Sequence, residues 1–186
     1  MPQAVFGEDT PPSVDGPFVL PGIYSIVLTA GGQQYRAPLV VHLDPRVHTS
    51  SADLRALLTY SQSLCASLER ADTLYQGEKP AREQLEALAH RLTARGADHE
   101  LLRAVEKLRD ETAARIKDLR RISGRLSGLE ADAESADLAP TPVDQEISDK
   151  ESKALDQAAS AWQESQPALR KLNERLKRAG LPAVSL

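Results

Sequence analysis

The chain has 186 residues, enough for one ordinary domain or two small ones, and it carries 23 Lys and Arg against 27 Asp and Glu. The resulting formal net charge of −4 excludes a globally basic nucleic-acid-binding protein, although a local basic patch remains compatible with it. Aromatic residues make up only 4% of the chain and charged residues 27%, a balance typical of helical, coiled-coil-like proteins and unlike that of an all-β sandwich.

The N-terminal stretch is rich in Pro, Gly and acidic residues, and we expect residues 1–17 to form a flexible arm. This stretch has no basic segment followed by an apolar one, so it does not read as a signal peptide. No apolar run approaches the roughly 18 residues that a membrane span requires. As written, the chain is therefore expected to be cytoplasmic and to lack a membrane segment.

Residues 18–47 predict a small β module. Residues 23–29 are rich in β-branched and aromatic side chains, residues 34–43 alternate in the same manner, and Gly31-Gly32 lies between them. A Gly-Gly turn favours an antiparallel hairpin, and Pro38 marks the second strand as an edge. Because a lone hairpin is marginally stable in water, we interpret the module as part of an incomplete β-sandwich that needs apolar cover from elsewhere.

Residues 48–186 predict a helical bundle. Thr49, Ser50 and Ser51 are N-cap candidates for a first helix, which Gly77 and Pro80 are expected to end. A shorter helix at about residues 79–95 is expected either as a separate element or nearly continuous with the third helix. The apolar seam of these two helices, spaced three and four residues apart, comprises Leu54, Leu57, Ser61, Leu64, Leu68, Ala71, Tyr75, Leu85, Leu88 and Leu92.

Two further long helices follow. Gly96 and Asp98 are expected to end one helix and begin the next, and Thr141-Pro142 predicts the start of the last helix, which contains Pro167 and stops at Gly180. Their inward residues are Leu101, Val105, Leu108, Thr112, Ile116, Leu119, Ile122, Leu126 and Leu129, then Ile147, Leu155, Ala158, Trp162, Leu169, Leu172 and Leu176. The predicted fold is mainly α: an antiparallel bundle of three long helices and a shorter one, with an N-terminal antiparallel β-hairpin.

The residues that commonly carry chemistry do not assemble into a catalytic, cofactor or metal signature. Glu86 and His90 have a spacing that could place two metal ligands on one helix face, but the sequence offers no second pair, and a solvated face is the preferred interpretation. His42, His48 and His99 stand alone. Cys65, the single cysteine, lies in an apolar helical pattern and is expected to be a half-buried small apolar residue without a disulfide. We therefore predict no catalytic residue, no metal ligand and no cofactor.

Charges alternate in sign along the long third helix and become acidic after it. We expect these charges to pair between helices or to face solvent. Nucleic-acid binding ranks last, because it calls for unopposed cations and stacking aromatics, which residues 103–151 lack. Trp162 is expected to be a core anchor of the bundle. The basic residues are Arg103, Lys107, Arg109, Arg115, Lys117, Arg120, Arg121 and Arg125, and the later acidic ones are Glu130, Asp132, Glu134, Asp137, Asp144, Glu146, Asp149 and Glu151.

Residues 20–47 carry a recognisable string: Pro21-Gly22, Tyr24, Gly31-Gly32, Tyr35, Pro38-Leu39 and Asp44-Pro45-Arg46. This string resembles the C-terminal module of bacterial sortilin-like (BNR or Asp-box) β-propeller proteins, which are often labelled glycosyl-hydrolase-like. Trp162, Leu172-Asn173 and Ala179-Gly180-Leu181-Pro182 fit the helical tail of that module. The resemblance implies a propeller that precedes the module, carries any ligand site and is absent from these residues, so no catalytic residue is carried over.

Two functions follow as hypotheses. The first is a non-catalytic structural or interaction module, the detached C-terminal tail of a sortilin-like protein, which packs on a protein partner or self-associates. The alternative is an accessory part of a glycosyl-hydrolase-like enzyme whose propeller is encoded separately. The DNA upstream of Met1 distinguishes them, since a propeller reading frame that ends just before it favours the second.

Overall fold

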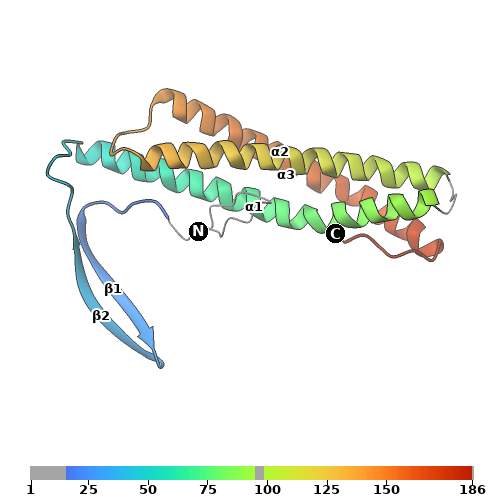
Figure 1. Cartoon of the computed structure of the whole chain (residues 1–186), viewed down its shortest axis with the longest axis horizontal. Helices are drawn as coiled ribbons and strands as arrows, with labels where there is room; N and C mark the ends of the chain where they lie inside the picture. The colour runs from blue at the N-terminus through green and yellow to red at the C-terminus, as the bar shows by residue number, and fades with distance from the viewer. Residues whose placement is uncertain (1–15, 95–98, 186) are drawn as a thin grey trace.

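A computed structural model describes residues 16–94 and 99–185 of the chain. Three long helices pack against one another: α1 (Ser51–Ala94), α2 (His99–Glu134) and α3 (Pro142–Arg178). A two-stranded antiparallel sheet precedes them, made of β1 (Gly22–Ala30) and β2 (Gln33–Val41). Figure 1 shows the helices lying lengthwise beside one another and the hairpin projecting from the bundle near the beginning of α1. The mainly α fold with an N-terminal hairpin is thus confirmed.

The hairpin has the predicted turn and alternation. Gly31 and Gly32 have positive φ angles of 57° and 78°, the left-handed conformation that a two-residue hairpin turn requires at both positions. Tyr24 lies opposite Leu39, and Ile26 lies opposite Ala37. Each strand begins one residue earlier than expected, and β2 ends at Val41, so that Leu43 lies beyond the strand.

The expected break at Gly77 and Pro80 is wrong. Both residues lie inside α1, which runs without interruption to Ala94, so residues 79–94 continue the first helix and no separate shorter helix forms. Pro80 lacks an N–H group and removes one helical hydrogen bond. The buried residues nevertheless keep their helical spacing on both sides of Pro80. Tyr75, Glu78, Ala81 and Leu85 are all buried. Tertiary packing of a long amphipathic face therefore overrides the local preference of these two residues.

The helix ends follow local rules where the structure describes them. Ser50 Oγ accepts a hydrogen bond of 3.1 Å from Asp53 N–H and caps α1. Thr141 caps α3 in a reciprocal capping box with Asp144. At the other end of α3, Gly180 has φ 66°, and Leu181 N–H donates to the Leu176 carbonyl at 2.9 Å, which is a Schellman turn. The expected roles of Gly96 and Asp98 lie outside the described residues.

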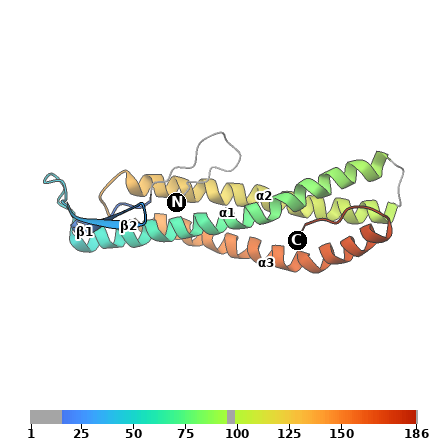
Figure 2. The same cartoon turned by 90° about the horizontal axis from the view of Figure 1, so that it is seen from below.

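The core of the bundle consists of two apolar clusters arranged along its length. The proximal cluster combines the first part of α1, the end of α2 and the beginning of α3: Tyr60, Leu64, Leu68, Ala71, Tyr75, Ile116, Leu119, Ile122, Leu126, Leu129, Leu155 and Ala158. The distal cluster combines Ala81, Leu85, Leu88, Ala89, Leu92, Leu101, Val105, Leu108, Leu169, Leu172, Leu176 and Val184. Figure 2 shows α1, α2 and α3 running together along both parts. Most residues of the apolar stripes predicted for the helices therefore lie in the interior of the bundle.

Candidate functional site

Most of the large apolar side chains that are exposed among the described residues lie on the hairpin. One face presents Tyr24, Ile26, Leu28, Tyr35 and Leu39, and Leu28 and Tyr35 are 61% and 55% exposed. The opposite face adds Ile23, Val27 and Val40, all exposed. Within residues 16–94 and 99–185 the two strands pair only with each other and pack against none of the three helices, although Val41 borders a cavity at the base of the hairpin. None of the three helices therefore provides the apolar cover that the sequence predicts for the hairpin.

The surface of the helices contrasts with that of the hairpin. Among the large apolar side chains that are exposed in residues 16–94 and 99–185, only Leu138 and Val143 lie outside residues 18–40. The apolar stripes of the three helices pack against one another, and the outer faces of the helices carry charged side chains. A helix whose apolar stripe is fully paired has no further need of a partner. Exposed apolar area of this kind, gathered on one element, marks an interaction surface.

A cavity of about 210 Å³ lies where the hairpin meets the bundle. Residues before β1, residues after β2 and the beginning of α1 supply most of its apolar lining, including Leu20, Leu43, Leu54 and Leu58, while Glu134 and Asp137 come from the end of α2 and the chain beyond it. Thr49 Oγ1 donates a hydrogen bond to the Asp137 carbonyl. The connector is thereby tied to the chain that leaves α2.

The connector itself is a local turn built around Asp44-Pro45-Arg46. Arg46 N–H donates to Asp44 Oδ1 at 2.9 Å, and the Arg46 guanidinium pairs with Asp44 Oδ2 at 2.7 Å. The Asp44 carbonyl accepts from Val47 N–H at 2.9 Å. Hydrogen bonds from Arg46 lower the pKa of the Asp44 carboxyl. This part of the sequence string therefore has a structural role: it turns the chain from β2 toward α1.

The histidines do not come together. His42 is exposed and borders the cavity at the hairpin base, and His48 and His99 are also exposed. His90 Nε2 lies 3.4 Å from Glu86 Oε1, with the imidazole 80% exposed, which is the solvated helix face preferred from the sequence. Among the residues that the structure describes, no group of three His, Cys, Asp or Glu side chains is placed to hold a metal ion.

The charges of α2 pair with those of the neighbouring helices, as expected. The carboxylate of Glu151 on α3, whose side chain is 1% exposed, forms ion pairs with Arg125 Nη1 at 2.6 Å and Arg121 Nη1 at 3.3 Å. Arg70 of α1 pairs with Asp156 of α3 at 2.5 Å. The arginines therefore hold the helices in register, and the cationic side of α2 is opposed by carboxylates at these positions.

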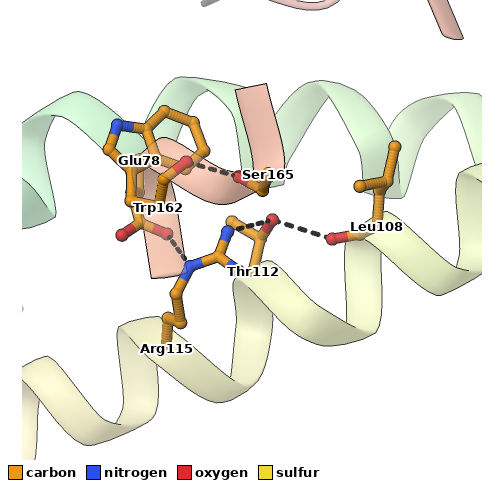
Figure 3. Close-up of polar contacts among 6 residues, drawn as sticks. All are labelled: Glu78, Leu108, Thr112, Arg115, Trp162 and Ser165. Carbon is orange, nitrogen blue, oxygen red and sulfur yellow. Dashed lines mark hydrogen bonds and ion pairs between the residues drawn. The ribbon is translucent and has the colours of Figure 1, made fainter. Parts of the chain in front are cut away.

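A polar layer separates the two apolar clusters, and Figure 3 shows its side chains converging from the three helices. Arg115 Nε donates to Glu78 Oε2 at 2.8 Å, and Arg115 Nη2 donates to Thr112 Oγ1 at 3.2 Å. The Trp162 ring lies under the guanidinium, 5.5 Å from its carbon. Trp162 is half-buried and packs against the distal cluster. The residue expected as a core anchor therefore also contacts the Arg115–Glu78 ion pair through the Arg115 guanidinium.

Glu78 is the residue of this layer whose carboxylate is only partly hydrogen-bonded. Its side chain is 0% exposed, and its Oε1 is buried without a hydrogen-bonding partner among the described residues. Burial raises the pKa of the Glu78 carboxyl, and the bond and charge of Arg115 oppose that rise only in part. Sequence reasoning missed Glu78, although an acidic residue on the inward stripe between Tyr75 and Ala81 is a signal that could have found it.

Cys65 is a free thiol in the proximal half of the bundle and is buried, more fully than the half-buried position expected from the sequence. Burial raises the pKa of this thiol, and the nearby charges of Glu130 and Glu134 raise it further. Such surroundings are the reverse of those that activate a cysteine. In this environment the thiol has the packing role of a small apolar side chain.

Comparisons with known proteins leave the chain without an assigned family. No family model matches it, and no curated protein or solved structure shows significant similarity to it. In the described part of the chain, the structure contains no helix long and apolar enough to cross a membrane.

Proposed function

We propose that this chain is a non-catalytic interaction module that binds a protein partner, or a second copy of itself, through its β-hairpin. The observation that carries the proposal is the distribution of exposed apolar side chains, which gather on residues 18–40 while the seams of the bundle are closed. The bundle then serves as the support that presents the hairpin.

The geometry of the hairpin favours a partner that supplies β-structure. In the described part of the chain the sheet consists of β1 and β2 alone, so each strand has one edge without a neighbouring strand. A strand of the partner can add to such an edge through main-chain hydrogen bonds. A sheet of the partner can also pack its apolar face on the face of the hairpin that carries Ile26, Leu28 and Leu39. The resemblance of residues 20–47 to the sortilin-like module supports a β-propeller protein of that kind as the partner.

The first test concerns the surface itself. We expect the wild-type chain to bind an apolar dye and to associate with rising concentration in light scattering. The double variant Ile26→Thr/Leu39→Thr keeps β-branched or strand-compatible residues and should lose both properties. Leu138→Thr is the matched control, because Leu138 is 65% exposed but lies outside the hairpin. A wild-type chain that is strictly monomeric and binds no dye would refute the proposal.

The second test concerns the partner. A sortilin-like propeller, if encoded upstream, is added to the labelled chain, and amide exchange is followed along β1 and β2. We expect slower exchange at the free edges of both strands and no change along α2. Unrelated genes upstream, together with unchanged exchange in the strands, would count against a propeller as the partner.

A further inference from the structure

The chain beyond α3 turns back and lies along the bundle. After the Schellman turn at Gly180, residues 181–185 run back without regular secondary structure, and we call them the return segment. Figure 1 shows this segment folding back from the end of α3 toward α1. Pro182, Ala183 and Ser185 are exposed, and Val184 is 2% exposed and belongs to the distal cluster. Val184 is thus the fully buried anchor of the segment, and Leu181, which is partly buried, packs against the same cluster.

Two side-chain amides from different helices hold the main chain of this segment. Asn173 of α3 accepts from Val184 N–H through Oδ1 at 2.8 Å and donates through Nδ2 to the Val184 carbonyl at 2.8 Å. Gln84 of α1 accepts from Ser185 N–H at 2.6 Å and donates to Ser185 Oγ at 2.9 Å. The two amides thus come from α1 and α3, the same two helices whose side chains pack with Val184 in the distal cluster.

This arrangement recognises an extended backbone. A carboxamide that both accepts from and donates to one residue satisfies its N–H and C=O together, as a neighbouring β-strand would. Neither bond from Asn173 depends on the side chain at position 184. Selectivity comes from the apolar slot filled by Val184, which suits a small branched side chain, and from the Gln84 amide, which suits a hydroxyl at the next position.

We propose that Gln84, Asn173 and the slot filled by Val184 form a binding site for an extended peptide, and that the return segment is its ligand in cis. The chemistry of a competing ligand is that of an uncharged extended segment with a branched aliphatic residue followed by Ser or Thr. The return segment can give way to such a ligand, because it is joined to α3 by one glycine turn and is held in the apolar core by two side chains alone, Val184, which is buried, and Leu181, which is partly buried. The site is independent of the hairpin surface and lies in the other half of the bundle.

The test uses the full chain with Val184→Asp, which expels the return segment from the slot and leaves Gln84 and Asn173 in place. The readout is the ¹⁵N spectrum of the side-chain NH₂ groups. We expect the Asn173 and Gln84 signals to move to the positions of free carboxamides in V184D. Added acetyl-Gly-Leu-Pro-Ala-Val-Ser-amide should return them toward the wild-type positions in a saturable manner, with a dissociation constant on the order of 1 mM.

Three controls make the test decisive. The same peptide with Asp in place of Val should produce no return, and the double variant Asn173→Ala/Val184→Asp should bind the parent peptide at least about tenfold more weakly. If circular dichroism shows that V184D has lost helicity, Val184→Thr, which keeps the shape of the side chain, is used with the same two readouts.

Two results would overturn the proposal. The first is a folded variant with released amides that gives no shift at several times the expected dissociation constant, or that binds both peptides equally. The second is a wild-type dimer that V184D dissolves, since it would place the return segment in the slot of a second copy rather than in cis.

Discussion

The carboxylate of Glu78 on α1 accepts a 2.8 Å hydrogen bond from Nε of Arg115 on α2, at the level where the proximal and distal clusters meet. Both side chains are largely withdrawn from water, with 0% of Glu78 and 12% of Arg115 exposed. A buried pair of this kind contributes little net stability, because its desolvation offsets its attraction, but breaking it by removing one partner is costly. The pair thus aligns α1 and α2 more than it strengthens the fold.

The raised pKa of Glu78 gives the stability a defined dependence on pH. A carboxyl whose pKa is higher in the folded state than in the unfolded state binds its proton more tightly when folded. Its contribution is therefore fully present below the unfolded pKa and is lost as pH rises through the folded pKa. We expect urea unfolding of the wild type to show this decline from about pH 4.5 upward, and Glu78→Gln to remove that component of the slope. Parallel pH profiles for the two proteins would contradict the assignment.

The contacts of Glu151 predict an unequal and non-additive response to removal of its arginines. Arg125→Ala should destabilise the fold more than Arg121→Ala, because its bond to Glu151 is 2.6 Å rather than 3.3 Å. The double variant leaves the buried carboxylate without either partner and should cost about 3–5 kcal/mol in chemical denaturation. Asp118→Asn, which removes only an exposed partner of Arg121, is the control and should cost less than about 1 kcal/mol. Additive single-variant effects would argue against a shared site.

The burial of Cys65 predicts an unreactive thiol. Its pKa is raised by burial and by the charges of Glu130 and Glu134, so little thiolate is present near neutral pH. In native buffer we expect the reaction with a disulfide reagent to be slower by orders of magnitude than in guanidinium. The rate in the native state should follow the opening of the bundle and therefore rise in Arg121→Ala/Arg125→Ala. Rapid labelling of the native wild type would show that this part of the core is open.

The turn of the hairpin predicts a sharp preference at Gly31. With φ at 57°, Gly31→Val should destabilise the turn by about 1–2 kcal/mol, whereas Gly31→Asn should be tolerated, because Asn adopts this conformation readily. The measurement is the set of nuclear Overhauser contacts between Tyr24 and Leu39, which face each other across the strands. Equal contacts in both variants would mean that the turn does not need a left-handed residue.

Sequence patterns were informative wherever a periodic or local rule governed the structure. The seam of α2 from Leu101 to Leu129 is buried as predicted, and Thr141 caps α3 in the expected way. The prediction failed at Gly77 and Pro80, where a local breaker signal competed with an apolar stripe that continued in phase. Composition also could not reveal the amides of Asn173 and Gln84, because their role depends on three segments that meet only in the folded chain.

The uninterrupted course of α1 through Gly77 and Pro80 makes the bundle a spacer of fixed length. At 1.5 Å per residue, the helical path from Ser51, beside the hairpin, to Gln84 measures about 50 Å. A globular partner of roughly 100 residues has a radius of gyration of about 13 Å, so a partner of that size centred beside Ser51 does not extend along α1 to Gln84. Two separate ligands, or one elongated ligand, are required to occupy both ends, and the helix determines how far apart they are held.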